Sequence, residues 1–512
     1  MSKIIEEQTA EQQREQNGGE SFEIIAKTFV GLEPILAKEL KALGAENVKE
    51  GRRMVSFTGD KRMLYLANFK LRTAIRILKP ITHFKARSAE DVYEGAKKID
   101  WSLYLDQNKT FTVDAVVFSE EFRHSMFVSY KIKDAIVDQF RERTGQRPNI
   151  SVTNPDIRLN IHIAEDRCTL SLDSSGESLH RRGYRQEHVE APLNEVLAAG
   201  MILMTGWHGE TDFIDPMCGS GTLPIEAALI AHNMAPGLFR KEYAFEKWAD
   251  FDSEMFDDIY NDDSQEREFE HHIYGYDIDP KAVAKAQRNV KAAGLSKDIT
   301  IELADFKDFV QPENKSIIIT NPPYGERIST PNLLKTYQMI GERLKHQFVG
   351  NDAWVLSYRE ECFDQIGLKP SLKVPLFNGA LECEFRRYQL FDGKFREFRS
   401  DGGEVKSEEE KRIMAQKNRF KKHREFKQRL EETQENEAKD IRSFILHPFS
   451  HQSFEKKKEE KHRKERSTEE RKPRPFAKSG YRNDRNAKRD NRKFDRKPHN
   501  EQRKTRRNNH ED

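Results

Sequence analysis

Apolar residues in the first half of the chain follow two different spacings. Residues 22–29 (FEIIAKTF) form a short apolar run typical of a strand, and residues 31–43 place leucines every four positions, as one face of a helix does. A second helix is predicted from the same interval at Val128, Ile132, Ile136 and Phe140. Mostly alternating apolar residues predict strands at 111–117, 157–163 and 170–172. This half of the chain is therefore expected to be α+β.

Strands and helices alternate in the second half, after a helix candidate at residues 192–207. Strands are predicted at 211–215, 273–277, 299–305, 316–320 and 353–357, and helices at 222–232, 280–294 and 333–348. Alternation of this kind implies a parallel, doubly wound sheet. The last two predicted strands, 372–377 and 380–391, are joined by Asn378-Gly379, a strong hairpin signal. The predicted fold class is α/β with a terminal antiparallel hairpin, preceded by the α+β region.

These patterns divide the chain into four parts. We expect a disordered leader at residues 1–20, the α+β region at 21–175, the α/β domain at 176–395 and a largely disordered tail at 396–512. Residues in the tail are mostly charged or polar, so the tail cannot bury enough apolar surface to fold. A charged stretch near 240–270 interrupts the α/β pattern, and we interpret it as an insertion.

Charge is distributed unevenly along the chain. From Asp401 to the end there are 35 Lys and Arg against 23 Asp and Glu, a net charge of +12, whereas the whole chain carries only +2. Residues 1–400 therefore carry a net charge of 2 − 12 = −10. A basic tail attached to an acidic body suggests contact with nucleic acid.

Cysteine usage and hydropathy narrow the class of protein further. The four cysteines lie far apart without a Cys-x-x-Cys spacing, which argues against a disulfide framework and a zinc site. No apolar run approaches the roughly 20 residues that a membrane span needs. We expect a soluble cytoplasmic protein that has no resident metal and no membrane attachment.

A glycine-rich turn follows the predicted strand 211–215. It reads Asp215-Pro216-Met217-Cys218-Gly219-Ser220-Gly221-Thr222 and precedes a helix. Glycines there let a ligand approach the backbone, and the helix start offers unpaired N–H groups. A tight turn that needs positive φ is the purely structural alternative. Because no lysine follows Gly221, a phosphate-binding loop is not indicated, and a cofactor with a carboxylate and a sulfonium fits better.

Two aspartates end the next two predicted strands. Asp277 can accept protons from both ribose hydroxyls of an adenosine. It lies 58 residues after Gly219, a distance that we attribute to the insertion. Asp279, just before Pro280, is assigned to helix capping instead. Asp305 is placed to contact an adenine amine, although a solvated loop acid is an equal alternative.

The most informative motif is Asn321-Pro322-Pro323-Tyr324, directly after the strand 316–320. The lone pair of a nucleobase amine is delocalised into the ring, so the amine is a poor nucleophile. A side-chain amide oxygen and a rigid backbone carbonyl beside prolines can accept its two protons and localise that lone pair. Tyr324 offers a flat surface on which a base can stack. The tetrapeptide lies at the carboxyl end of a strand, where open α/β sheets bind ligands, and this position favours a functional role over a simple turn.

Taken in order, DPMCGSGT, GYDID, ADF and NPPYGER resemble the class I S-adenosylmethionine-dependent methyltransferases that act on amino nitrogens. The upstream region is similar to a ferredoxin-like domain followed by a THUMP domain, an RNA-binding module. The likeness is greatest to the RlmL branch, the guanine-N2 methyltransferases of 23S ribosomal RNA. It rests on residues 131–148, 170–185, 191–203 and 376–391. Some members carry a second methyltransferase domain; no second glycine-rich turn follows here, so a second activity is not expected.

The resemblance implies a role for each matched residue. The cofactor, S-adenosylmethionine, would be held by Asp215, Pro216, Cys218, Gly219, Ser220, Gly221, Thr222, Asp277 and Asp305. Within this set, Asp277 would take the ribose, Asp305 the adenine and the glycine turn the methionine end. The catalytic residues would be Asn321, Pro322, Pro323 and Tyr324, which hold the guanine amine. Phosphate contacts are predicted for Arg123, Lys131, Lys133, Arg141, Arg147, Arg181, Arg182 and Arg185.

The implied activity is methyl transfer to the N2 of a guanine in 23S ribosomal RNA, with that RNA or a large-subunit assembly intermediate as partner. A transfer-RNA guanine-N2 methyltransferase and a non-catalytic, RNA-binding assembly factor remain alternatives. DNA-adenine and protein-glutamine methyltransferases share the Asn-Pro-Pro-Tyr motif, but the RNA-binding-like first region argues against both.

Overall fold

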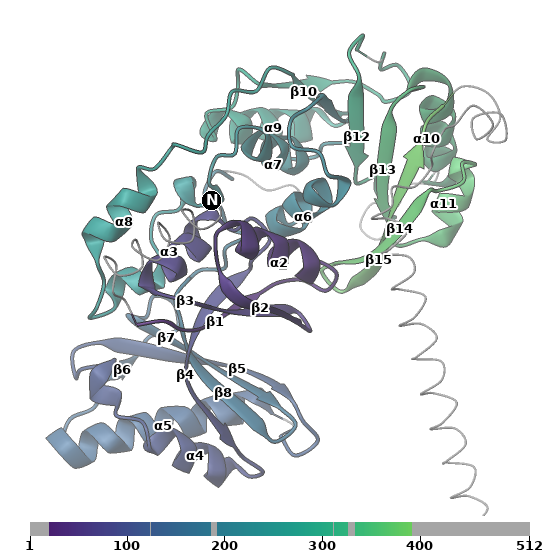
Figure 1. Ribbon diagram of the computed structural model, residues 1–512. Coiled ribbons are helices and arrows are strands. Elements are labelled where there is room, and N and C mark those ends of the chain that lie inside the picture. Colours follow the sequence, from purple (N-terminus) through teal and green to yellow (C-terminus); the bar gives the residue numbers. More distant parts are fainter. Residues whose placement is uncertain (1–19, 123, 186–191, 311, 326–332, 392–512) are drawn as a thin grey trace, which may run out of the picture. The chain divides into compact units, whose positions relative to one another are not determined.

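The computed structural model describes residues 20–122, 124–185, 192–310, 312–325 and 333–391 (Figure 1). The predicted tail and nearly all of the predicted leader lie outside these ranges. Within them, no helix combines the length and the apolar character that crossing a membrane requires. All four cysteines are described, and each is a buried free thiol.

The first half of the chain forms an eight-stranded sheet in the order β2-β3-β1-β4-β8-β7-β5-β6. Its strands are β1 (Phe22–Lys27), β2 (Glu46–Gly51), β3 (Met54–Gly59), β4 (Arg76–Lys85), β5 (Thr110–Phe118), β6 (Asn149–Ile150), β7 (Ile157–Ala164) and β8 (Arg167–Asp173). The helices are α2 (Glu33–Ala42), α3 (Lys61–Lys70), α4 (Ala89–Lys97) and α5 (Ser125–Thr144), with a short 3₁₀ turn, η1 (Trp101–Leu103). Because β4 pairs with β1 on one side and with β8 on the other, it joins two halves into one sheet.

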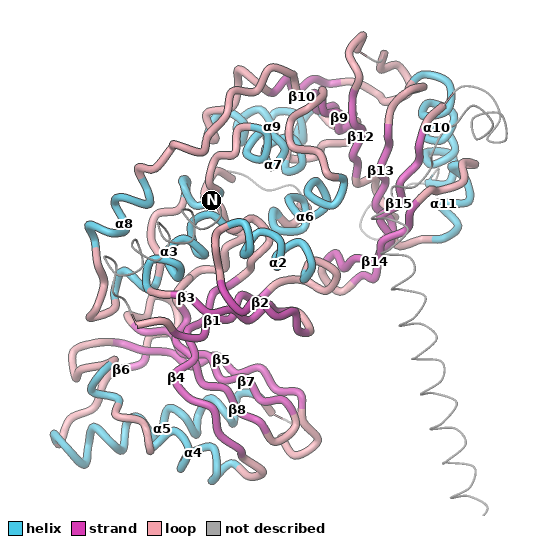
Figure 2. Tube along the Cα trace, viewed as in Figure 1, coloured by secondary structure: helices cyan, strands magenta, loops and turns pink. Residues whose placement is uncertain are grey.

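Apolar periodicity explains why these elements form. The predicted helix face of Val128, Ile132, Ile136 and Phe140 is the buried face of α5, which confirms that prediction. Along β7, the alternating Ile157, Leu159, Ile161 and Ile163 are all buried. Figure 2 shows α4 and α5 side by side along this part of the sheet. The α+β prediction for this region is therefore confirmed.

A seven-stranded sheet follows, in the order β11-β10-β9-β12-β13-β15-β14. Its strands are β9 (Asp212–Asp215), β10 (Ile273–Asp277), β11 (Ile299–Leu303), β12 (Ser316–Thr320), β13 (Asp352–Ser357), β14 (Leu372–Asn378) and β15 (Leu381–Gln389). The helices are α6 (Glu195–Thr205), α7 (Thr222–Ala231), α9 (Pro280–Ala292), α10 (Leu333–Gln347) and α11 (Glu360–Ile366). The pairs among β9 to β13 are parallel, and β15 pairs antiparallel with β13 and β14, which confirms the predicted α/β fold.

Helices cover both faces of this second sheet. Phe213 of β9 belongs to the core beneath α6, α7 and α9, and the next residue, Ile214, belongs to the core beneath α10 and α11. Successive side chains of a strand point to opposite faces, so a strand buried on both sides is apolar throughout. This explains the continuous apolar run of β12, whose five residues are all buried.

The terminal hairpin differs from the prediction by one residue. Asn378 pairs with Leu381, so the two turn residues are Gly379 and Ala380 rather than Asn378 and Gly379. Gly379 has a φ of 65°. A glycine at the first of two turn positions is the usual requirement of one type of tight hairpin turn, which accounts for the shift.

The charged stretch near 240–270 contains η3 (Ala244–Lys247) and α8 (Ser253–Tyr260), preceded by η2 (Pro236–Phe239). Its aromatic residues pack against α3 of the first sheet. The ring of Phe245 stacks on Tyr65 with 4.4 Å between centroids, and Phe256 meets Phe245 edge-on at 5.1 Å. The inserted segment therefore completes the core of the first domain.

We expect Phe245→Ala to destabilise the chain by about 3–5 kcal/mol, because it removes a fully buried ring and leaves a cavity. Urea unfolding would measure this change. Phe118→Ala is the matched control, since Phe118 is 55% exposed and its loss should cost under about 0.5 kcal/mol. Equal stability of the two variants would contradict the assignment of the insertion to the core.

Candidate active site at the carboxyl ends of the parallel strands

The four predicted motifs meet at one edge of the second sheet. Strands β11, β10, β9 and β12 are neighbours and run parallel, so their carboxyl ends lie together. Asp215 ends β9, Asp277 ends β10, Asp305 follows β11 and Asn321 follows β12. The chain leaves β9 toward β10 on one side, whereas β12 lies on the other side. Ligands of open α/β sheets bind at such a reversal of strand order.

The glycine-rich turn packs against α9 on one side and borders open space on the other. Gly219 has a φ of 56° and Gly221, at the start of α7, has a φ of 83°. A Cβ atom at Gly219 would meet nothing within 4 Å, whereas at Gly221 it would lie 3.2 Å from Cβ of Ala286 on α9. The two glycines thus serve different purposes: Gly221 allows helix packing, and Gly219 borders open space.

Most side chains of this turn point inward. Pro216, Ser220 and Thr222 are buried, and only Met217 and Gly219 are partly exposed between Asp215 and Thr222. The Cys218 backbone N–H donates to the Tyr276 carbonyl at 2.8 Å, and burial raises the pKa of the Cys218 thiol well above its usual value. Cys218 therefore packs beneath the turn. Met217 is partly exposed, packs against the core beneath α10 and α11, and was not among the predicted site residues.

Asp215 is fully enclosed at the end of β9. Burial raises the pKa of its carboxyl to about 8, although the Met217 backbone N–H donates to Oδ1 at 3.2 Å and opposes this shift. Burial therefore favours the protonated form of this carboxyl.

Asp277 connects the turn to the neighbouring strand. Its Oδ2 accepts the Gly219 backbone N–H at 2.9 Å, and its Oδ1 accepts the Asp279 backbone N–H at 2.9 Å. Each carboxylate oxygen retains a further lone pair that can accept a ligand hydroxyl. Asp279 accepts from the Lys281 backbone N–H and caps α9, as predicted.

Apolar residues flank Asp277 on the exposed side. Ile278 is 69% exposed, and Leu303, which is paired with Asp277 in the sheet register, is 58% exposed. Such surfaces suit the face of an adenine ring. Neither residue was predicted, because an apolar residue at a strand end does not reveal its exposure in the sequence.

Asp305 lies near this surface but is already paired. Burial would raise the pKa of its carboxyl, but hydrogen bonds from the backbone and side chain of Lys307 outweigh burial and lower it. The Lys307 Nζ lies 3.0 Å from Asp305 Oδ2. A contact from Asp305 to an adenine amine would therefore share the carboxylate with Lys307.

The Asn321–Tyr324 tetrapeptide adopts a closed arrangement. The Tyr324 hydroxyl donates to Asn321 Oδ1, the atom predicted to accept a substrate proton. The Tyr324 ring meets Tyr358 edge-on, with 5.7 Å between centroids, and its carbonyl accepts from Arg359 Nη1 at 3.3 Å. Pro322 is buried and Pro323 is partly buried. Because an amide oxygen has two lone pairs, a substrate amine would share Asn321 Oδ1 with the tyrosine hydroxyl or displace it.

Two of the predicted RNA contacts are wrong. The side chains of Arg182 and Glu226 are 2% and 0% exposed, and Arg182 Nε lies 3.4 Å from Glu226 Oε1. Arg182 Nη2 also donates to the Arg72 carbonyl at 2.5 Å. Arg185 is 7% exposed and pairs with Glu195 at 2.7 Å. Both guanidinium groups are enclosed by protein, so they are not available to phosphates.

The remaining predicted contacts lie on the surface or outside the described residues. Arg123 is not described, and Arg181 is exposed and pairs with Glu177. The structure brings four residues to one cavity of about 830 Å³ on α5 and the segment after it: Lys131, Lys133, Arg141 and Arg147. Glu90, Asp134 and Asp138 pair with three of these cations at 3.3–3.7 Å. The prediction of phosphate contacts at these four remains a prediction.

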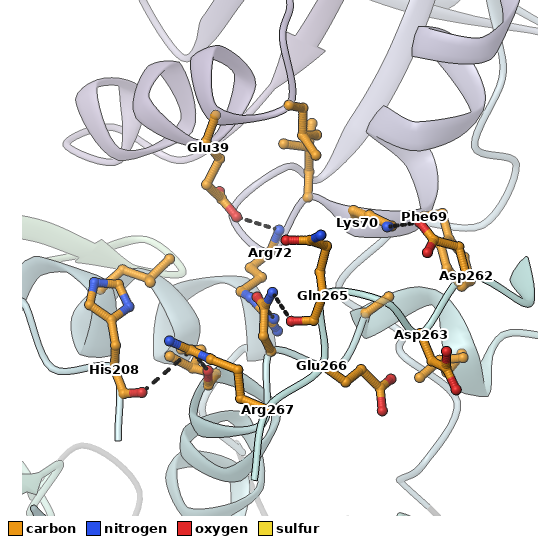
Figure 3. A pocket seen from close by; sticks show the side chains of 18 of the residues that line it. Glu39, Phe69, Lys70, Arg72, His208, Asp262, Asp263, Gln265, Glu266 and Arg267 are labelled. Atoms are coloured by element: carbon orange, nitrogen blue, oxygen red, sulfur yellow. Dashed lines mark hydrogen bonds and ion pairs between the residues drawn. The ribbon is translucent and has the colours of Figure 1, made fainter. Parts of the chain in front are cut away.

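Another cavity, of about 460 Å³, lies between helices α2 and α3 and residues 203–267 (Figure 3). Figure 3 shows Glu39 accepting the Arg72 backbone N–H, at 2.8 Å, with Arg267 and His208 on the opposite wall. Burial lowers the pKa of Arg72 to about 10. None of the predicted site residues lines this cavity, so it is separate from the strand-end edge.

Comparison with known proteins identifies the domains. Residues 182–387 match the model of an RMKL-like methyltransferase domain, residues 86–173 a THUMP domain and residues 23–78 an RlmL ferredoxin-like domain. The fold and the strand-end motifs thus define a class I S-adenosylmethionine-dependent methyltransferase domain that follows a THUMP domain.

Several relatives share this arrangement. Ribosomal RNA large subunit methyltransferase K/L of Syntrophotalea carbinolica is 41% identical over 71% of this chain and 53% of its own length. A putative RNA methyltransferase of Synechocystis is 39% identical over 70% of this chain and 95% of its length. This chain therefore belongs to the RMKL-like methyltransferase family. It spans about half the length of the K/L relative and nearly all of the Synechocystis protein.

Solved structures agree with this assignment. SMU.472, a putative methyltransferase complexed with SAH, has a TM-score of 0.66 at 28% identity, over 73% of this chain and 99% of its own. A possible methylase from Clostridium difficile has a TM-score of 0.67 at 31% identity, over 73% and 100%. S-adenosylmethionine is the cofactor of this chain.

The strand-end residues fit that cofactor. Open space above Gly219 leaves room beside the backbone, the Asp277 carboxylate faces the same turn, and exposed Ile278 and Leu303 offer an apolar surface next to it. The described residues contain no group of three or more His, Cys, Asp or Glu side chains placed to bind a metal.

We expect Arg182→Ala to lower the free energy of unfolding by about 3–5 kcal/mol, because it leaves the buried Glu226 carboxylate unpaired. Arg181→Ala, one residue earlier and exposed, should change it by under about 1 kcal/mol. Denaturant unfolding distinguishes the two. Unchanged stability of Arg182→Ala, with a weaker salt dependence of RNA binding, would restore the phosphate-contact prediction.

The raised pKa of Asp215 predicts a pH dependence of stability. Between about pH 4 and pH 8 the folded state keeps a proton that the unfolded state has lost, so stability falls as pH rises through this window and then levels off. The melting temperature of wild type relative to Asp215→Asn should therefore decrease up to about pH 8. A constant difference between pH 5 and pH 9 would show that Asp215 is ionised throughout.

Proposed function

We propose that this chain transfers a methyl group from S-adenosylmethionine to the exocyclic N2 of a guanine in 23S ribosomal RNA. Two kinds of observation support this. The K/L relatives from Syntrophotalea and Methylococcus, 41% and 38% identical, are named as ribosomal RNA large subunit methyltransferases. The chain also carries a THUMP domain beside its methyltransferase domain.

The observation that carries the proposal is the position of Asn321. Strand β12, which it follows, pairs directly with β9, which leads into the glycine turn. The amide therefore lies at the edge where the cofactor turn begins. Methyl transfer needs donor and acceptor in line and close together, and such positioning can supply much of the rate acceleration.

The chemistry assigned to these residues is hydrogen-bond acceptance without a covalent intermediate. As the amine gains the methyl group, it would release one proton to solvent. Asn321 Oδ1 and the Pro322 carbonyl would each accept one N–H of the guanine amine, which directs its lone pair out of the ring. The cofactor's sulfonium supplies an electrophilic methyl group when bound. The Pro322 carbonyl, the second hydrogen-bond acceptor, is held rigidly, because prolines on both sides of its peptide unit fix the backbone.

RNA would reach this edge with its target base unstacked, at a cost of a few kcal/mol. Lys131, Lys133, Arg141 and Arg147, which line one cavity of the THUMP domain, are candidates to hold the phosphates. The proposed partner is 23S ribosomal RNA or a large-subunit assembly intermediate, in the cytoplasm.

Asn321→Ala should lower the rate of methyl transfer about 10²–10³-fold, as expected when one preorganised group at a reacting atom is lost. RNA affinity should stay within about twofold. Asn314→Ala is the matched control, because Asn314 is exposed just before β12. Transfer of labelled methyl groups to RNA measures the rate, and filter binding measures affinity. Wild-type activity of Asn321→Ala would refute the proposed amine acceptor.

The same assay tests the substrate. Ribosomal RNA, transfer RNA and duplex DNA from a strain that lacks this protein are supplied separately, and modified bases are mapped by mass spectrometry. We expect N2-methylguanine in 23S RNA alone. Methylation of transfer RNA only would favour the transfer-RNA alternative, and no methylation of any substrate, despite cofactor binding, would favour the assembly-factor alternative.

A further inference from the structure

Arg185 contacts the cofactor turn from inside the domain. Its Nη1 donates to Ser220 Oγ at 2.8 Å, and its Nη2 donates to Thr222 Oγ1 at 2.8 Å. On its other side, Nε donates to Glu195 Oε1 at 2.7 Å and Nη2 to the Leu193 carbonyl at 3.3 Å. One planar guanidinium therefore joins the start of α6 to both hydroxyls that flank Gly221.

The turn depends on such contacts because its own sequence does not fix it. Gly221 is the N-cap of α7 and has no side chain with which to cap the helix. Gly219 and Gly221 both have positive φ, and glycine gains the most conformational freedom when such restraints are lost. Other contacts also hold the turn: Asp277 accepts from Gly219 N, Asn289 Nδ2 donates to the Ser220 carbonyl at 3.0 Å, and Cys218 N donates to the Tyr276 carbonyl at 2.8 Å.

Arg185 restrains the side chains of the turn, whereas these other contacts restrain its backbone. Asp277 and Asn289 bind backbone atoms from β10 and α9, whereas Arg185 binds side-chain hydroxyls from the direction of α6. The Glu195 carboxylate fixes the orientation of the guanidinium and neutralises its charge in a site where both side chains are 7% exposed. A guanidinium presents donors in a rigid fork, and a lysine ammonium cannot reproduce that geometry.

We propose that Arg185, oriented by Glu195, is a positioning residue that sets the shape of the glycine turn and thereby the affinity for S-adenosylmethionine. The proposal rests on the cofactor assignment and is independent of which base is methylated. The turn would contact the cofactor equally in the ground state and in the transition state. Loss of the Arg185 contacts would therefore weaken cofactor binding in both states to the same extent. The KM for S-adenosylmethionine rises, and kcat changes little.

Three variants separate this role from general stabilisation. Arg185→Lys keeps the charge and loses the fork. Thr222→Val keeps the volume of the side chain and removes one acceptor. Lys297→Arg, at an exposed position of the same domain just before β11, is the control. Thermal melting reports folding, calorimetry with S-adenosylmethionine alone reports affinity, and steady-state kinetics on RNA separate KM from kcat.

The expected result is a rise in the Kd and KM for S-adenosylmethionine on the order of tenfold in Arg185→Lys, equivalent to about 1.4 kcal/mol, with kcat within about threefold and RNA affinity unchanged. Thr222→Val should shift Kd in the same direction, and Lys297→Arg should match wild type. If Arg185→Lys does not fold, Thr222→Val decides the question.

A purely structural role predicts a different pattern. The melting temperature and the active fraction would fall, but the Kd for S-adenosylmethionine of the folded protein would equal that of wild type, and this result would overturn the proposal. Absence of S-adenosylmethionine binding by wild type would overturn the proposal together with the cofactor assignment. Cofactor binding without methylation of ribosomal RNA would refute only the substrate assignment, because calorimetry still reports the effect of Arg185.

Discussion

The pairing of β9 with β10 on one side and β12 on the other is the constraint on which the site depends. All three strands are parallel, so the residues that follow them emerge at one edge. Motifs about one hundred residues apart, the glycine turn after β9 and the Asn321 tetrapeptide after β12, become neighbours because the strands that precede them pair. The backbone ladder thus brings the cofactor turn beside the proposed amine-binding peptide.

A buried polar network adds rigidity to this arrangement. Arg182 contacts both Glu226 on α7 and the Arg72 carbonyl, which belongs to the segment between α3 and β4 of the first sheet. Tyr184 donates to the same carboxylate at 2.9 Å. Buried ion pairs contribute little net stability but strongly penalise any arrangement that leaves a partner unpaired. The segment 182–185 thus ties the first domain, helix α7 and the cofactor turn to one geometry.

Much of the fold could be predicted because its signals are local. The apolar repeats of α5 and β7 identified each element, and the alternation of strands with helices gave the parallel sheet. The place of Asp215, Asp277 and Asn321 at strand ends also follows from local pattern. Burial does not, because it depends on what the rest of the chain packs around a residue. Arg181, Arg182 and Arg185 look alike in sequence, yet one is exposed and two are enclosed.

The same limit applies to the charged insertion. Its charged composition indicated only an insertion, but Phe245, Phe256 and Tyr260 are spaced so that they contact α3, a helix nearly two hundred residues earlier. A few aromatic residues outweigh many charged ones, because each buries a large apolar surface while charged side chains remain at the rim. Mean polarity is therefore a poor guide to whether a segment contributes to a core.

The closed tetrapeptide has an energetic consequence for substrate selection. With Tyr324 donating to Asn321 Oδ1, the amide oxygen is satisfied before any base enters. Because an amide oxygen has two lone pairs, a guanine amine bound as proposed can use the second one or displace the hydroxyl, and the amide oxygen stays hydrogen-bonded in both cases. A base that presents a carbonyl at that position has no proton to donate to Asn321 Oδ1, so it gains no bond from that oxygen. The tetrapeptide would thereby favour an amine, because only a donor can bind there.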